Sequence, residues 1–263
     1  MPAPKNTFKQ ALKDDHRQMG CWVGLADPYI AEITASAGFD WLLIDCEHAP
    51  NDLRSMMAQL KVIEASDSHP VVRLPIGETS MIKQFLDAGA QSLLIPMVES
   101  REQAEQLVAA VQYPPKGVRG VGSALARASK FNEIKDYLTT ADQEICLLVQ
   151  VENRAGLAAL DDILTVDGVD GVFIGPADLA ADMGHIGQPT HPDVVAAIED
   201  ALVRIKKSGK APGILSTNME FMTRCMELGV LFAATSIDVT LYASAIRAEA
   251  EKARELASEQ KPD

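Results

Sequence analysis

The stretch from residue 38 to residue 48, GFDWLLIDCEH, decides the fold of the chain. Its centre, residues 41–45, is an apolar run that ends in an aspartate and shows no polar alternation. This pattern is typical of a parallel strand buried on both faces. Gly38 precedes the run, where a helix often ends in a left-handed residue. Two ionisable residues, Glu47 and His48, follow it, so the stretch predicts a helix end, a buried strand and a candidate site in succession.

Seven further apolar runs of this kind occur along the chain. The eight predicted strands are residues 20–25, 41–45, 70–74, 92–97, 145–151, 171–175, 212–215 and 231–235. Between them lie amphipathic segments with helical spacing, at residues 52–65, 80–88, 101–111, 154–164, 192–207, 219–228 and 239–256. Strand and helix alternate eight times, which predicts a (β/α)8 TIM barrel. A doubly wound sheet is the alternative.

Helix ends support this assignment. Asp52, Thr79 and Ser100 are residue types that suit helix N-caps. Four glycines come directly before a predicted strand, where a left-handed helix end is needed: Gly38, Gly89, Gly168 and Gly229. The longest irregular stretch, residues 113–130, is rich in proline and glycine and is predicted to be a large loop near the fifth strand. The spacing of Gly117, Gly120 and Gly122 there precedes no convincing nucleotide-binding helix.

Composition narrows the class of protein. The chain has 263 residues, 47% of them hydrophobic, and nothing resembling a linker, so we expect one domain over residues 1–263. A formal net charge of −13 argues against a nucleic-acid partner. No apolar run is long enough for a membrane span, and the polar N-terminus is unlike a signal peptide. The widely spaced Cys21, Cys46, Cys146 and Cys225 predict buried free thiols in a reducing cytoplasm.

Polar residues gather at the carboxyl ends of the predicted strands, where barrel enzymes carry their active sites. They are Asp45, Glu47, His48, Arg73, Gln150, Glu152, Asp178 and Ser216. Carboxylates on neighbouring strands suit a hard divalent cation, so Glu152 and Asp178 are candidate metal ligands. A structural salt bridge is the alternative for either residue.

Three further candidates each have a structural alternative. Asp45 and His48 suit a dyad in which the carboxylate holds the imidazole in one tautomer, unless His48 is a surface or capping residue. Arg73 suits an anion or a polarised oxygen, unless it is a partner of Glu47 or Asp45. Residues 175–178, GPAD, suit either a carboxylate-binding helix start or an ordinary one. The predicted strands contain no lysine, which argues against a Schiff-base aldolase.

Four long motifs carry a resemblance to a known family. They are residues 38–50, 113–129, 168–179 and 210–215. On these stretches the chain resembles the HpcH/HpaI family of class II, metal-dependent pyruvate aldolases. The resemblance implies a lyase that cleaves 4-hydroxy-2-oxo acids, such as 4-hydroxy-2-oxoheptanedioate, to pyruvate and an aldehyde. Residues 74–78 are closer to the sugar-acid aldolases of the family, and Cys46 stands where glycine is expected, so 2-dehydro-3-deoxy-glucarate or -rhamnonate types are alternatives.

The resemblance also implies roles for individual residues. Glu152 and Asp178, with Gln150 beside them, would bind Mg²⁺, Mn²⁺ or Co²⁺. Arg73 would contact the keto oxygen, and His48, oriented by Asp45, would transfer the proton. The backbone of Ala177 and Asp178 would hold the carboxylate, and Trp22 and Leu215 would line the pocket. Glu47, Arg127 and Ser216 are possible further members of the site.

A quaternary arrangement is implied as well. The resemblance predicts a homohexamer of dimers in which the last helix is exchanged between subunits, with loop 119–129 near a neighbouring subunit's site. Two other functions are weighed against the aldolase: a lyase or mutase for phosphoenolpyruvate-like or acyl-CoA substrates, and a non-catalytic binding barrel. The first would need more cationic loops than this chain offers. The second would not need His48, Arg73, Glu152 and Asp178 together.

Overall fold

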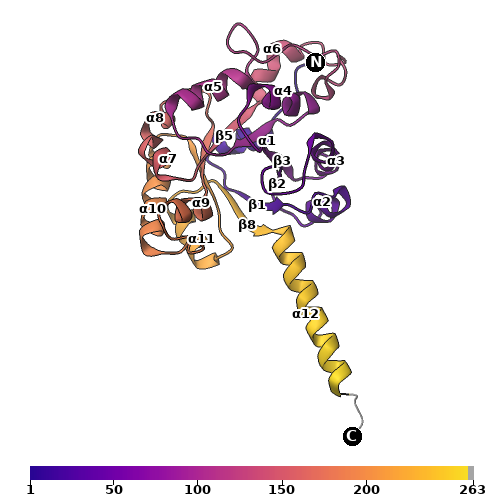
Figure 1. Cartoon of the computed structure of the whole chain (residues 1–263). Coiled ribbons are helices and arrows are strands. Elements are labelled where there is room, and N and C mark those ends of the chain that lie inside the picture. Colours follow the sequence, from indigo (N-terminus) through magenta and orange to yellow (C-terminus); the bar gives the residue numbers. More distant parts are fainter. Residues whose placement is uncertain (260–263) are drawn as a thin grey trace.

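The computed structural model describes residues 1–259 and shows a closed barrel of eight parallel strands surrounded by helices (Figure 1). The strands are β1 (Gln18–Val23), β2 (Trp41–Asp45), β3 (His69–Arg73), β4 (Ser92–Ile95), β5 (Cys146–Val151), β6 (Gly171–Ile174), β7 (Ala211–Leu215) and β8 (Phe232–Ile237). Each strand pairs with its sequence neighbours, and β8 closes on β1. The predicted TIM-barrel fold is confirmed, and the doubly wound alternative is wrong.

Each predicted amphipathic segment is helical, and the structure adds α1, α2 and α6, which no predicted segment covers. The α-helices are α1 (Thr7–Lys13), α2 (Pro28–Ala35), α3 (Leu53–Ile63), α4 (Thr79–Ala88), α5 (Arg101–Val111), α6 (Tyr137–Thr140), α7 (Arg154–Ala158), α8 (Leu160–Leu164), α9 (Pro176–Asp182), α10 (Pro192–Lys207), α11 (Met219–Glu227) and α12 (Asp238–Glu259). Short 3₁₀ turns lie at Arg127–Ser129 and Ala141–Glu144. The four glycines predicted at helix ends all have positive φ, between 90° and 112°.

The structure corrects two local expectations. The segment predicted as one helix over 154–164 is two short helices, because the chain bends at Ala159. The N-cap of α4 is Glu78 and not Thr79, which is already helical. Asp52 and Ser100 do cap α3 and α5, because each side chain accepts a backbone N–H of the first turn.

Aromatic side chains fill the barrel, where two glycines make room for them. A Cβ on Gly20 would lie 2.2 Å from the indole of Trp41, and one on Gly213 would lie 2.2 Å from the ring of Phe232. Phe8 of α1 packs from below against both rings. The amino end of the barrel is therefore closed by side chains, and the carboxyl end is left for the site.

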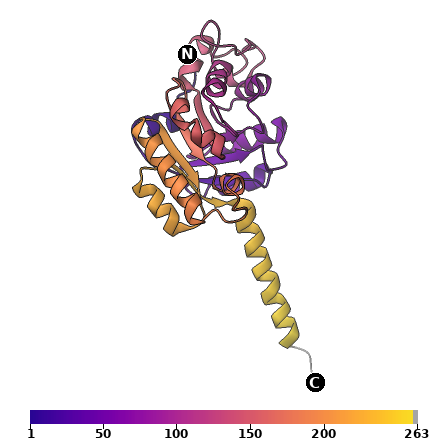
Figure 2. The same ribbon diagram turned by 60° about the vertical axis from the view of Figure 1, so that its left-hand side comes forward.

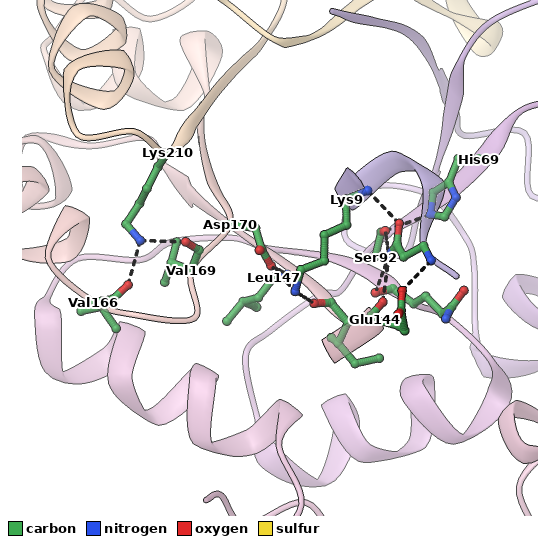
Figure 3. A network of polar contacts seen from close by, with 12 residues as sticks. Lys9, His69, Ser92, Glu144, Leu147, Val166, Val169, Asp170 and Lys210 are labelled. Carbon is green, nitrogen blue, oxygen red and sulfur yellow. Dashed lines mark hydrogen bonds and ion pairs between the residues drawn. The ribbon is translucent and has the colours of Figure 1, made fainter. Parts of the chain in front are cut away.

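A polar network seals the same amino end (Figure 3). Lys9 of α1 forms an ion pair with Asp170 at 3.3 Å, and Asp170 accepts the backbone N–H of Leu147 at 2.9 Å. His69 at the start of β3 lies 2.9 Å from the hydroxyl of Ser92, and its ring stacks on Phe8. Burial lowers the pKa of His69 to about 4. These contacts hold α1 under the barrel.

The large loop predicted at residues 113–130 lies before β5, at the amino end of the barrel. Arg119 anchors it, with its guanidinium 4.4 Å from the ring centroid of Tyr113 and 5.8 Å from that of Tyr137. The side chain of Arg119 is fully buried and bonds to Asp87 at 3.0 Å. Cation–π contacts and an ion pair therefore order a segment that has little regular structure.

Helix α12 extends away from the barrel (Figures 1 and 2). Its large apolar side chains Val239, Leu241, Tyr242, Ile246 and Leu256 are between 39% and 61% exposed. Among residues 1–259, none of the helices has the length and apolar character needed to cross a bilayer. All four cysteines are buried and free, as predicted.

Candidate functional site

A cavity of about 360 Å³ opens at the carboxyl ends of the strands. Eight of the residues singled out in the sequence line it: Trp22, Asp45, His48, Arg73, Gln150, Ala177, Asp178 and Leu215. They come from β1, β2, β3, β5, β7, the turn that follows β2 and the first turn of α9. The barrel thus brings together side chains that are up to 193 residues apart in the sequence, between Trp22 and Leu215.

Arg73 is the central cation of the cavity. The register of β2 and β3 places it opposite Asp45, and its Nε and Nη2 donate to the two Asp45 oxygens at 2.9 and 2.6 Å. Its Nη1 lies 2.9 Å from Oε2 of Glu47, and the guanidinium lies 5.1 Å from the Trp22 ring centroid. Arg73 is therefore a structural partner of Asp45 and Glu47, which the sequence left open as the alternative to an anion-binding role. Two of its five N–H groups bond to Asp45, so Arg73 can still donate to a ligand oxygen.

Asp45 is a buried carboxylate that stays ionised. Burial alone raises its pKa, but the hydrogen bonds and charge of Arg73 outweigh burial and lower it below its usual value. Trp22 Nε1 also donates to Asp45 Oδ2 at 3.3 Å. The backbone N–H groups of Glu47 and His48 reach Oδ1 at 3.0 and 3.4 Å. Asp45 thus shapes the turn that carries His48.

The predicted dyad between the side chains of Asp45 and His48 is not formed in this structure. The His48 ring is 65% exposed, and its Nε2 lies 3.9 Å from Oε2 of Glu47. Asp45 reaches His48 through the backbone N–H and not through the imidazole. The physical reason is the strand register, because Arg73 lies directly across from Asp45 and takes both of its oxygens.

Glu152 is buried beneath the cavity, just beyond the end of β5. Its Oε1 accepts the Met97 backbone N–H at 2.9 Å, and its Oε2 accepts from Gln150. Gly175 makes space for it, because a Cβ there would lie 2.6 Å from Glu152 Oε2 and 3.2 Å from Gln150 Nε2. The Oε1 atom of Gln150 is buried with no partner in the structure. Gln150 therefore keeps one amide oxygen that accepts no hydrogen bond from the described residues and is free to bind a ligand.

Three carboxylates converge on this rim. Burial is the main reason that the pKa of Glu152 is raised, and the charges of Glu47 and Asp178 raise it further. Burial also raises the pKa of Glu47, against the lowering effect of Arg73. Asp178 is exposed on the first turn of α9. Carboxylate and amide oxygens are the ligands that a hard divalent cation prefers, so the residue types present at the rim fit the predicted metal.

The start of α9 faces the cavity through Ala177 and Asp178. Pro176 occupies the first turn of the helix, and Gly175 is an extended N-cap with no side-chain hydrogen bond. N–H groups in a first helical turn lack intrahelical acceptors. They are therefore available to an anionic group in the cavity.

Mostly apolar side chains form another part of the cavity wall. Trp22 and Leu215 line it as predicted, and Phe173 packs on Trp22 with ring centroids 5.4 Å apart. Ile237, Val239 and Thr240, where β8 passes into α12, complete the wall. Sequence reasoning missed Phe173, Met97 and these last three, because an apolar or backbone contribution to a site leaves no distinctive residue type.

Four predicted members do not line the cavity, and Glu152, which is buried behind Gly175, is one of them. Glu47 lies beside it and acts through Arg73. The Ser216 hydroxyl accepts the N–H of Asn218 at 3.2 Å, in the turn before α11. Arg127 lies at the opposite end of the barrel, where it pairs with Glu64 and donates to the Ala88 carbonyl at 3.1 Å. The structure therefore does not place Arg127 at the cavity of its own chain.

Comparison with known proteins agrees with this geometry. Residues 18–245 match the family described as HpcH/HpaI aldolase/citrate lyase. The chain is 60% identical over 247 residues to a hydroxypyruvate/pyruvate aldolase of Roseovarius nubinhibens, covering 94% of this chain and 96% of the relative. It is 56% identical over 239 residues to a 4-hydroxy-2-oxo-heptane-1,7-dioate aldolase of Salmonella dublin, covering 91% of each.

A solved structure extends the match to three dimensions. A HpcH/HpaI aldolase/citrate lyase family protein from Burkholderia cenocepacia superimposes with a TM-score of 0.90 at 39% identity, covering 95% of this chain and all of that one. The family match, the relatives and the barrel agree over nearly the whole described chain. The chain therefore belongs to the HpcH/HpaI aldolase/citrate lyase family.

Proposed function

We propose that this protein is a class II pyruvate aldolase that reversibly cleaves 4-hydroxy-2-oxo acids to pyruvate and an aldehyde. The observation that carries the proposal is the convergence of Arg73, Gln150, Asp178 and the first turn of α9 on one cavity above the buried Glu152. The names of the relatives support a pyruvate or hydroxypyruvate donor, with 4-hydroxy-2-oxoheptanedioate as one substrate. The absence of lysine from all eight strands also argues against a Schiff base.

We assign the divalent cation, Mg²⁺, Mn²⁺ or Co²⁺, to Glu152 and Asp178, with the Oε1 atom of Gln150 beside them. The support is the raised pKa of Glu152, the unsatisfied amide oxygen and the carboxylate of Asp178 at the same cavity. When bound, the cation would supply Lewis-acid stabilisation of negative charge on a 2-oxo acid.

The residues of the chain supply the remaining chemistry. The N–H groups at Ala177 and Asp178 hold the substrate carboxylate, and a free N–H of Arg73 stabilises the charge that develops on the keto oxygen during cleavage. His48 is the candidate base for the C4 hydroxyl, since its exposed imidazole borders the cavity. Trp22 and Phe173 exclude water from one side of the bound pyruvate or hydroxypyruvate.

We also propose that the chain assembles as a homohexamer in which α12 packs on a second copy. A helix of 22 residues with five large apolar side chains exposed would bury this surface against a partner. Val239 and Thr240, in the first turn of α12, line the cavity, so the position of this helix affects the shape of the site. The four buried free cysteines are consistent with a reducing cytoplasm.

A direct test combines pyruvate or hydroxypyruvate with an aldehyde panel in the presence of Mg²⁺, Mn²⁺ or Co²⁺. The panel should include succinic semialdehyde for the heptanedioate reaction, and tartronate semialdehyde and lactaldehyde for the glucarate and rhamnonate alternatives. We expect condensation, together with exchange of pyruvate methyl protons for deuterium. Full activity after rigorous metal removal would contradict the class II assignment. Saturable pyruvate binding without proton exchange would instead favour a non-catalytic binding barrel.

A further inference from the structure

A second cluster of metal-binding side chains lies where α9 passes into α10. His185 follows the end of α9, His191 is the N-cap of α10, and Asp193 lies in its first turn. Their donor atoms all lie within 4.8 Å of one another. His185 Nε2 is 3.5 Å from Asp193 Oδ2, and His191 Nδ1 is 3.8 Å from the same oxygen.

These separations are those of a small cation site. Zinc bonds to nitrogen and oxygen of about 2.0–2.2 Å, in a tetrahedron, place neighbouring donor atoms roughly 3.4 Å apart. The two measured distances to Asp193 Oδ2 approach that spacing. Two imidazoles and one carboxylate favour a borderline metal over Mg²⁺, which prefers an all-oxygen octahedron. Three protein ligands leave a fourth position for water.

The two histidines of this cluster are in direct contact. The two imidazole rings stack face to face, with centroids 3.5 Å apart and planes at 13°. Imidazole lone pairs lie in the ring planes, so one ion can bond to both histidines only after one ring turns about its side-chain torsions. The His191 Nδ1 lone pair accepts the Asp193 N–H at 3.3 Å, a long capping bond that a metal bond could replace. The side chains of His185 and His191 are 25% and 31% exposed, so a dissolved ion can reach them.

We propose that His185, His191 and Asp193 bind a divalent transition-metal ion of the Zn²⁺ or Co²⁺ type, at a second site apart from the carboxylates of the rim. Such an ion would tie the end of α9 to the start of α10. The backbone N–H of His185 donates to the Ala180 carbonyl of α9 at 2.7 Å. Because α9 begins with the residues that line the cavity, the bound ion would stiffen the helix that carries Asp178.

The experiment uses the full chain with the rim site removed by Glu152→Gln and Asp178→Asn, after metal stripping. Co²⁺ is titrated with visible absorption as the readout, and Zn²⁺ by calorimetry. We expect one equivalent of either ion, a tetrahedral Co²⁺ spectrum, little displacement by excess Mg²⁺, and a raised melting temperature with Zn²⁺. Adding His185→Gln or His191→Gln should weaken binding at least ~10-fold, whereas His16→Gln, at an exposed histidine, should not.

Two results would overturn the proposal. One is that the chain with Glu152→Gln and Asp178→Asn binds neither Co²⁺ nor Zn²⁺ at concentrations up to about millimolar. The other is binding that persists unchanged when His191→Gln and the isosteric Asp193→Asn are combined. Thermal melting of each variant without metal shows whether the loop substitutions leave the fold intact. Neither readout depends on aldol activity, so the outcome is separate from that of the proposed function.

Discussion

Gly175→Ala tests how Glu152 is held. Gly175 has φ −93° and ψ 98°, which alanine adopts without strain, so only the space around the added Cβ matters. That atom would lie 2.6 Å from Oε2 of Glu152 and 2.8 Å from its Cβ, well inside the ~3.5 Å optimum for carbon contacts. Overpacking of this kind costs about 1–3 kcal/mol of unfolding free energy.

Relief of this strain by movement of Glu152 would disturb its hydrogen bonds with Met97 and Gln150. We therefore expect Mn²⁺ affinity to fall by at least ~10-fold, a loss typical when groups that position ligands are disturbed. Calorimetric Mn²⁺ titration measures the affinity, and urea unfolding measures the stability. Gly122→Ala is the matched control, because its Cβ would have its nearest neighbour at 3.7 Å. If Gly175→Ala matched this control in both measurements, the assignment of Glu152 would fail.

Three further predictions concern other parts of the molecule. Burial lowers the pKa of His69 to about 4 in the folded chain, so as the pH falls below 6.5 the unfolded chain takes up this proton first. The free energy of unfolding should therefore fall by about 2 kcal/mol between pH 7 and pH 5. In urea unfolding, His69→Gln should reduce this pH dependence. Arg73→Met should lower the free energy of unfolding by about 3–5 kcal/mol at pH 8, because Asp45 is then buried without its cation. The loss should be smaller near pH 4, where Asp45 can be protonated. An equal loss at both pH values would contradict the pairing of Arg73 with Asp45. Ile246→Glu should reduce the sedimenting mass if α12 packs on a second copy, whereas Glu251→Ala, at an exposed position of the same helix, should not.

The fold was predictable because its signals are local. A strand covered on both faces must be apolar throughout, and the predicted bounds of β2 are those of the structure, residues 41–45. A helix that ends before a strand needs a left-handed residue, and Gly38, Gly89, Gly168 and Gly229 all provide it. Helix α1 was missed because it buries only Phe8 and Leu12, and its reason for folding is the barrel floor beneath which it packs.

The site was predictable in position but not in its internal pairing. Parallel strands bring their carboxyl ends to one rim, so His48, Arg73 and Asp178 had to lie near one another. Which carboxylate takes which partner depends on register across strands that are far apart in sequence. Asp45 pairs with Arg73 because they lie opposite each other on β2 and β3. His48, three residues beyond the end of the same strand, is left exposed at the cavity mouth.

The charges around the cavity explain why a cation belongs in the proposed reaction. Arg73 contributes +1, and Asp45, Glu47, Glu152 and Asp178 contribute −4 when all are ionised, so the formal sum is +1 − 4 = −3. Asp45 and Glu47 already engage the guanidinium, which leaves little of its charge for a third anion. Burial is the main reason that the pKa of Glu152 is raised, and the negative charges of Glu47 and Asp178 raise it further. A 2-oxo acid would add another carboxylate to this rim, which would be repelled unless a divalent ion first neutralised Glu152 and Asp178. Donor binding and metal binding should therefore be thermodynamically coupled, each strengthening the other by the same factor.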